Sequence, residues 1–75
     1  MAWWVAIKGS ELELSGRTEV SEASAKDAAV AVSQRTPGTV FQVRYRVNAN
    51  ARTEVRWEAI DGQLQEVTGE ARKHP

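Results

Sequence analysis

Arginine is the residue type in this sequence best suited to recognising a partner. In residues 40–47, VFQVRYRV, apolar and polar side chains alternate, so Arg44 and Arg46 point to the polar face of a predicted strand. Because a guanidinium group makes paired hydrogen bonds to carboxylate or phosphate, such a face can bind an anion. The candidate partner-binding residues are four arginines of this region, with a tryptophan and a lysine of the N-terminal strand as secondary candidates: Arg44, Arg46, Arg52, Arg56, Trp4 and Lys8.

The same face also fits an ordinary solvated surface. A regular register places Arg44 opposite Arg56, and like charges in that position destabilise a sheet. Glu54 and Glu58 then lie diagonal to these arginines, and surface pairs of this kind contribute a few tenths of a kcal/mol, roughly. The sequence is therefore consistent with a binding face and with a solvated face.

Residues that could carry catalysis or hold a metal are few. The chain has no cysteine and one histidine, His74, next to the last residue, whereas a metal site or a catalytic triad needs a fixed imidazole or thiolate with partners. The carboxylate pairs Glu11/Glu13 and Glu54/Glu58 lie beside basic residues, which favours their charged forms and disfavours a general acid. We therefore expect a protein that is not an enzyme and that holds no metal or other cofactor.

The N-terminal residues predict a β-hairpin. Strand-forming residues run from Trp3 to Lys8 and reach Gly9-Ser10, which suits a two-residue type II′ turn. Residues 11–14 then pair back on this strand with their apolar side chains on the same face. Trp4 has the parity of the polar face, where it is either exposed or covered by another segment.

A helix is expected next, ending at residues 36–38, TPG. Ser21 or Ser24 can cap its start, and Ser24 with Asp27 resembles a capping box. Small apolar residues recur on one side at helical spacing and predict a helix that lies close against a sheet. These residues are Ala25, Ala28, Ala29 and Val32.

Three further strands complete the pattern. They are predicted over residues 40–47, 53–60 and 63–68. A loop over Asn48–Arg52 joins the first two, and Asp61-Gly62 is a strong hairpin turn between the last two. Alternation in the last strand is poor, which predicts a bulge or an early end.

Together these elements predict an α+β domain with the order β-β-α-β-β-β. It is one antiparallel sheet with a single helix packed on one face and the other face left to solvent or a partner. The predicted register pairs Phe41 with Ala59, Val43 with Trp57 and Tyr45 with Val55 on one face, and Gln42 with Glu58 on the other. Residues 1–68 are expected to form this single domain, and residues 69–75 a flexible C-terminal tail.

Charge is balanced in sum but uneven along the chain. Ten basic and ten acidic side chains cancel, which removes the simplest argument for nucleic-acid binding. Residues 35–56 hold five arginines and one acid, whereas residues 10–27 hold five acids and two basic residues. This layout favours an oriented encounter with a charged partner. The N-terminus lacks the features of a signal peptide or a membrane span, so we expect a cytoplasmic protein.

Three motifs together resemble small phage-encoded anti-CRISPR proteins, especially a type I-F inhibitor with a similar strand–strand–helix–three-strand plan. They are SAKDAA over residues 24–29, Gly38-Thr39-Val40 opening a strand, and the aromatic strand from Trp57 to the Asp61-Gly62 turn. The likeness covers most of residues 3–67. It implies a non-catalytic protein that docks on a crRNA-guided surveillance complex and occupies a surface meant for target DNA.

Three functional hypotheses follow from the sequence. The first is a binding module from a phage or mobile element that docks on a host protein or ribonucleoprotein complex, such as a CRISPR surveillance complex, and blocks it sterically. The second is a small DNA- or RNA-binding domain that uses the basic hairpin. The third is a self-assembling protein. We expect no membrane partner and a monomer or weak dimer.

Overall fold

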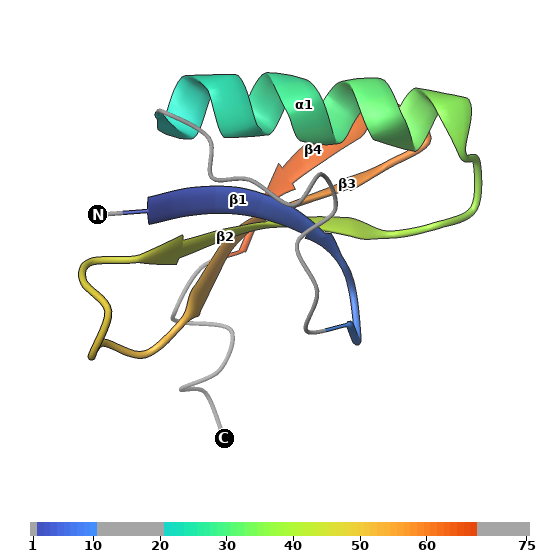
Figure 1. Cartoon of the computed structure of the whole chain (residues 1–75). Coiled ribbons are helices and arrows are strands. Elements are labelled where there is room, and N and C mark those ends of the chain that lie inside the picture. Colours follow the sequence, from blue (N-terminus) through green and yellow to red (C-terminus); the bar gives the residue numbers. More distant parts are fainter. Residues whose placement is uncertain (1, 11–20, 68–75) are drawn as a thin grey trace.

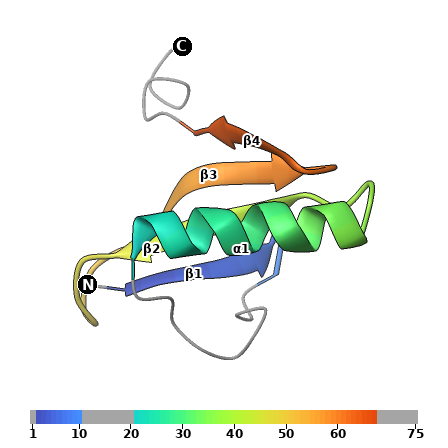
Figure 2. The same ribbon diagram turned by 90° about the horizontal axis from the view of Figure 1, so that it is seen from above.

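The structure, a computed structural model, describes residues 2–10 and 21–67, and in these residues one helix lies across one face of a four-stranded antiparallel sheet (Figures 1 and 2). The strands lie side by side in the order β1-β2-β3-β4. The predicted α+β class with one antiparallel sheet and one covering helix is confirmed. The elements are β1 (Ala2–Ile7), α1 (Glu22–Arg35), β2 (Phe41–Arg46), β3 (Glu54–Ile60) and β4 (Gln63–Glu66).

Two of the sequence predictions fall outside the described residues. One is the strand over residues 11–14 that was expected to pair with the N-terminal strand. The other is the C-terminal tail over residues 69–75. The strands over 40–47, 53–60 and 63–68 are each present but shorter, and the last ends early at Glu66.

The core lies between α1 and the sheet. Ala25 and Ala29 are fully buried, so the small side chains predicted on this side of the helix do allow a close approach to the strands. Trp3 packs against Tyr45 with 4.5 Å between the ring centroids. The other buried apolar residues come from the strands: Val5, Phe41, Val43 and Ala59.

The N-terminus of α1 is capped by Ser21. Its backbone is extended, and its hydroxyl accepts a hydrogen bond from the Ser24 N–H at 3.1 Å, while the Ser24 hydroxyl accepts one from the Ser21 N–H at 3.3 Å. These reciprocal bonds form a capping box. The predicted box between Ser24 and Asp27 is therefore wrong, because Ser24 already lies within the first turn of the helix.

The C-terminal part of α1 is tied to the turn between β3 and β4. Ser33 is fully buried, and its hydroxyl accepts a hydrogen bond from the Gly62 N–H at 2.8 Å. Asp61 and Gly62 have φ values of 52° and 83°, the left-handed pair that a type I′ turn requires. The predicted Asp61-Gly62 hairpin is confirmed. Asp61 also accepts a hydrogen bond from the Gly38 N–H at 2.9 Å.

The turn after β1 begins one residue earlier than predicted. The Ser10 N–H donates to the Ile7 carbonyl at 2.9 Å, so the central residues of the turn are Lys8 and Gly9. Gly9 has a φ of 90°, which glycine adopts without strain. The Lys8 N–H donates to the Val40 carbonyl at 3.0 Å, which extends the pairing between β1 and β2 past Ile7.

A β-bulge breaks the predicted register of β2 and β3. The pairs Phe41–Ala59 and Val43–Trp57 are formed as predicted, but the register shifts after Val43. Arg44 then pairs with Val55, and Arg56 becomes the extra residue of the bulge. The predicted pairing of Arg44 with Arg56 is therefore wrong.

The bulge also changes the faces on which the side chains of β3 lie. Tyr45 pairs with Glu54 and not with Val55, as had been predicted. Val55 joins the face that α1 does not cover, whereas the Arg56 guanidinium lies over the rings of Trp3 and Tyr45. Because β2 ends at Arg46 and β3 begins at Glu54, the connection between them covers residues 47–53 and is longer than the predicted five-residue loop.

Candidate binding surface

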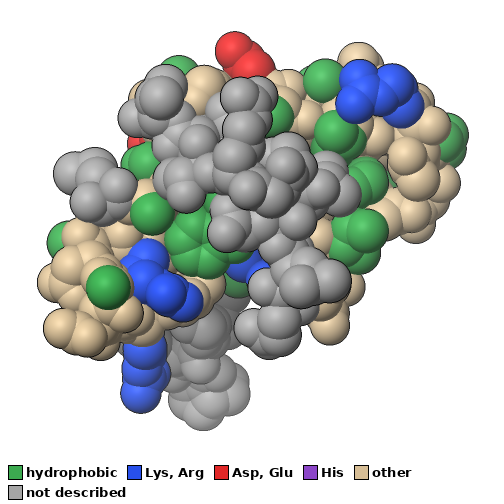
Figure 3. Space-filling view, viewed as in Figure 1, with side chains coloured by type: hydrophobic (Ala, Val, Ile, Leu, Met, Phe, Trp, Pro, Cys, Tyr) green, Lys and Arg blue, Asp and Glu red, His purple; other side chains and the backbone are tan. Residues whose placement is uncertain are grey.

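Basic and aromatic side chains gather at the end of the sheet where β2 and β3 are connected. We call this region, residues 45–56 with Trp3 and Trp4, the hairpin end. In Figure 1 the connection over residues 47–53 projects away from α1. Figure 3 shows Lys and Arg side chains over this end of the molecule, while the acidic side chains visible on the same face lie elsewhere. The hairpin end therefore presents positive charge.

Arg46 is held by two contacts on the face that α1 does not cover. Its guanidinium carbon lies 5.6 Å from the centre of the Trp4 ring, and Nη2 donates to the Thr53 hydroxyl at 2.7 Å. Its Nε atom is buried and has no hydrogen-bond partner among the described residues. No carboxylate of residues 2–10 and 21–67 forms an ion pair with Arg46. The positive charge is thus positioned by neutral groups and is not neutralised by them.

Arg56 lies on the opposite face of the same end. Its guanidinium carbon is 5.8 Å from the Trp3 ring centre and 5.5 Å from that of Tyr45. Nη1 also forms an ion pair with Glu54 at 3.6 Å. Both partners of that ion pair are about half exposed, with side-chain exposures of 43% and 53%, so water weakens it strongly.

Arg52 supplies the third positive charge of the hairpin end. It is exposed within the connection over residues 47–53, and no ion pair joins it to the described part of the chain. This connection is ordered in part by Asn48, whose side-chain oxygen accepts a hydrogen bond from the Asn50 N–H at 2.9 Å. Three arginines against the single carboxylate of Glu54 leave two net positive charges.

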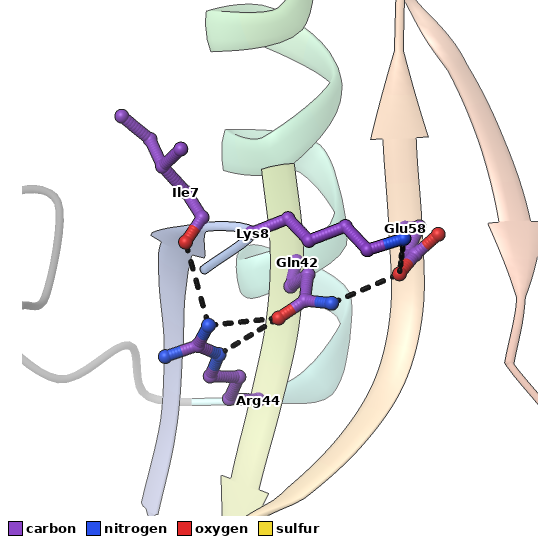
Figure 4. A network of polar contacts seen from close by, with 5 residues as sticks. All are labelled: Ile7, Lys8, Gln42, Arg44 and Glu58. Carbon is purple, nitrogen blue, oxygen red and sulfur yellow. Dashed lines mark hydrogen bonds and ion pairs between the residues drawn. The ribbon is translucent and has the colours of Figure 1, made fainter. Parts of the chain in front are cut away.

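Arg44 is not on an exposed surface, contrary to the sequence prediction. Its exposure is 8%, and its Nε and Nη2 atoms donate to the Gln42 side-chain oxygen at 3.0 and 2.8 Å (Figure 4). Nη1 donates to the Ser10 carbonyl at 2.6 Å, and Nη2 makes a longer bond of 3.4 Å to the Ile7 carbonyl. Because a buried charge is costly without hydrogen bonds, these acceptors stabilise it. Arg44 therefore ties the turn after β1 to β2.

Lys8 lies at the other end of the sheet from Arg46. Its Nζ atom is 3.8 Å from Glu58 Oε2, and its side chain is 62% exposed. The same Glu58 oxygen accepts a hydrogen bond from the Gln42 side-chain amide at 2.9 Å (Figure 4). The predicted pairing of Gln42 with Glu58 is thus confirmed. Lys8 continues the network around Arg44 and does not contribute to the hairpin end.

The structure thus brings together four of the six predicted site residues, Trp4, Arg46, Arg52 and Arg56, and separates Arg44 and Lys8 from them. Trp4 is half-buried, so it is neither fully exposed nor fully covered, which were the two alternatives that the sequence left open. The sequence did not indicate Val55 or Thr53 as surface residues of the helix-free face. The one feature of the sequence that could have indicated the bulge was the unfavourable pairing of Arg44 with Arg56 in a regular register, which the bulge avoids.

A hollow of about 580 Å³ lies next to the hairpin end. A second hollow of about 290 Å³ lies over β3 and β4, and Glu58 lines both. The lining of the first is mixed in polarity and includes residues that the sequence analysis did not single out. Its residues are Gln42, Arg52, Thr53, Glu54, Val55, Glu58 and Val67.

Comparison of the chain with protein-family models, with curated protein sequences and with solved structures finds no match. The likeness to phage-encoded inhibitors therefore stays a prediction. Within residues 2–10 and 21–67, α1 is too short and too polar to cross a membrane. The same residues contain no group of three or more His, Cys, Asp or Glu side chains placed to hold a metal ion.

Proposed function

We propose that this protein is a non-catalytic binding module that docks through its hairpin end on an acidic surface of a host protein or ribonucleoprotein complex. It acts by occupying that surface and excluding the partner's normal ligand. The observation that carries the proposal is that Arg46, Arg52 and Arg56 lie at one end of the sheet. Within the described residues the only ion pair of these arginines is the one between Arg56 and Glu54, and two of the three guanidinium groups lie over aromatic rings.

The stacking supports this role because it holds the guanidinium groups in place before a partner arrives. A free arginine loses side-chain entropy when it is fixed at an interface. Arg46 has already lost much of that freedom through Trp4 and Thr53, so less is lost on binding. Arginine and tryptophan are also the residue types most enriched among the residues that dominate interface affinity.

A protein surface suits this site better than a nucleic acid does. Nucleic-acid binding through aromatic residues requires a ring face on which a base can stack. Here the Trp4 ring carries Arg46, and Trp3 is only 7% exposed and carries Arg56. Small clusters of carboxylates on a protein match three arginines without needing a free ring. A DNA- or RNA-binding role is the alternative that the experiment below must separate.

The biological setting belongs to the same proposal. A phage or mobile-element inhibitor of a cytoplasmic host complex is what the sequence resemblance implies. The hairpin end is compatible with that role, because a cluster of arginines can cover an acidic patch of a large assembly. Its net positive charge does not favour an inhibitor that imitates DNA through acidic side chains.

The test is a pull-down from bacterial lysate with the tagged full chain, carried out with and without nuclease. The variant Arg46→Glu/Arg52→Glu reverses the charge of the hairpin end, and Arg35→Glu changes one exposed arginine at the far end of α1 as a matched control. Circular dichroism must first show that both variants are folded. We expect a discrete protein partner that survives nuclease, is retained by Arg35→Glu and is lost with the double variant.

Two results would contradict the proposal. Recovery of nucleic acid alone, with binding that falls steeply as salt rises, would show that counterion release from phosphates drives the interaction. An unchanged set of partners with the double variant would show that the hairpin end is only solvated surface.

A further inference from the structure

The face of the sheet that α1 does not cover has a buried part and an open part. Over the part of β1 and β2 that lies away from the hairpin end it is buried, with Ala6, Gln42 and Arg44 at most 8% exposed. Over β3 and β4 it is open, because Val55 and Val67 are only half-buried and Ile60 is 40% exposed. The two hollows lie over this open part.

The two hollows adjoin each other at Glu58, and the larger one begins at the hairpin end. Arg52 belongs to the hairpin end and also lines the larger hollow, while Glu58 is shared by both hollows. Val55 and Val67 supply apolar surface beyond Arg52. We call the combined surface of the two hollows the groove. Arg52 lies at one end of it and Ile60 at the other.

The charges along the groove differ between its start and its middle. Arg52 has no ion pair with the described residues, whereas Glu54, which also lines the larger hollow, pairs with Arg56. Glu58, in the middle, already accepts a hydrogen bond from Gln42 and pairs with Lys8. A ligand that fits has one negative group at the Arg52 end and an uncharged, partly apolar continuation.

We infer that this groove takes an extended peptide segment of an acidic protein partner, with one acidic side chain at Arg52 and an apolar side chain over Val55 and Val67. The inference rests on the proposed function and specifies what part of the partner is bound. A nucleic-acid strand fits less well, because its regularly spaced phosphates would meet the carboxylates of Glu54 and Glu58 after passing Arg52.

The test uses a short capped peptide, Glu-Ser-Val-Ser-Val, titrated into the ¹⁵N-labelled full chain and followed by NMR. In an extended peptide, alternate side chains share a face, so the glutamate and both valines can face the groove together. The matched controls are Gln-Ser-Val-Ser-Val, which lacks the charge, and Glu-Ser-Ser-Ser-Ser, which lacks the apolar groups.

We expect the Glu-Ser-Val-Ser-Val peptide to shift the amide signals of Thr53, Val55 and Val67. Its affinity should exceed that of each control peptide by about fivefold, the ratio expected for one charge-assisted hydrogen bond or for two partly buried apolar side chains. Arg52→Gln should remove the difference between the glutamate and glutamine peptides. Val55→Thr, which keeps the side-chain shape, should reduce the difference between the valine and serine peptides.

Several results would overturn the inference. These are equal affinities for the three peptides, shifts confined to residues away from the groove, and tighter binding of a thymidine oligonucleotide at the same amides. Shifts that depend on protein concentration without any peptide would assign the groove to a second copy of the chain. If the pull-down depends on Arg46 and Arg52 but no peptide binds, the groove inference fails while the proposed function stands.

Discussion

The two ends of the sheet are held together in different ways. At the end that includes residues 7–10, 33–44 and 58–63, which we call the closed end, hydrogen bonds join segments that are far apart in the sequence: Ser33 to Gly62, Gly38 to Asp61, and Arg44 to the turn after β1. The first and the last of these bonds are partly buried, and the bond between Gly38 and Asp61 is exposed. At the hairpin end, the described contacts are ring stacking and partly exposed polar pairs.

Arg44 and Arg46 illustrate this difference most directly. They are two residues apart on β2 and point to the same face, yet Arg44 is buried against uncharged oxygen atoms whereas Arg46 lies on a tryptophan ring. Residue type and strand parity are identical, so the neighbours decide the role. The comparison assigns Arg44 to folding, and the proposed function assigns Arg46 to binding. Four predictions test this difference.

The largest loss of stability is expected for Arg44→Leu. This change removes the Arg44 donors to the Gln42 side-chain oxygen and to the Ser10 carbonyl, and it leaves the Gln42 oxygen in a region of low exposure. Unsatisfied buried groups of this kind cost about 2–4 kcal/mol in total. Urea unfolding should show a loss of that size, with Arg46→Leu as the matched control at well under half of it. Equal losses for the two variants would contradict the comparison.

The second prediction compares the loss of stability when one side-chain hydroxyl is removed at the closed end and one at the hairpin end. Ser33→Ala leaves the Gly62 N–H without its acceptor in a partly buried position, which should lower the free energy of unfolding by about 1–2 kcal/mol. Thr53→Val removes the exposed bond to Arg46 and should cost less than about 0.5 kcal/mol. Thermal unfolding of both variants measures the difference. A costlier Thr53→Val would show that the hairpin end contributes to stability as much as the closed end does.

Local sequence signals were sufficient to predict most of the fold. The spacing of Ala25, Ala28, Ala29 and Val32 predicted the buried side of α1, and Asp61-Gly62 predicted the last hairpin. Each of these signals lies within one short segment and needs no knowledge of the rest of the chain. The same holds for the alternation of apolar and polar residues in β2, whose apolar side chains do face the helix.

The candidate site was predicted only in part, because its arrangement depends on contacts between segments. Residues 54–59 alternate between polar and apolar without interruption, so nothing within that segment indicates the bulge at Arg56. The bulge separates Arg56 from Arg44 and places it over Trp3 and Tyr45. Likewise, the burial of Arg44 depends on carbonyl groups that lie far away in the sequence.

A third prediction concerns how Arg46 is positioned. Trp4→Leu keeps apolar area at the hairpin end but removes the ring on which the Arg46 guanidinium rests. Partner binding should weaken about threefold to tenfold, because cation–π stacking at such sites contributes about 0.5–1 kcal/mol and holds the side chain in place. The measurement is a titration with the partner recovered in the pull-down, and stability is measured in parallel. Unchanged affinity would show that the stacking does not prepare Arg46 for binding.

The smallest effect is expected for Lys8→Gln, which tests whether the exposed edge of the closed end matters. The Lys8–Glu58 pair spans 3.8 Å with a largely exposed lysine, so its loss should cost less than about 0.5 kcal/mol in urea unfolding. Glu58 keeps its hydrogen bond from Gln42, and partner binding at the hairpin end should not change. A loss above about 1 kcal/mol would mean that Gln42 alone does not stabilise the Glu58 charge. The closed end would then depend on Lys8 as well as on the hydrogen bonds of Arg44.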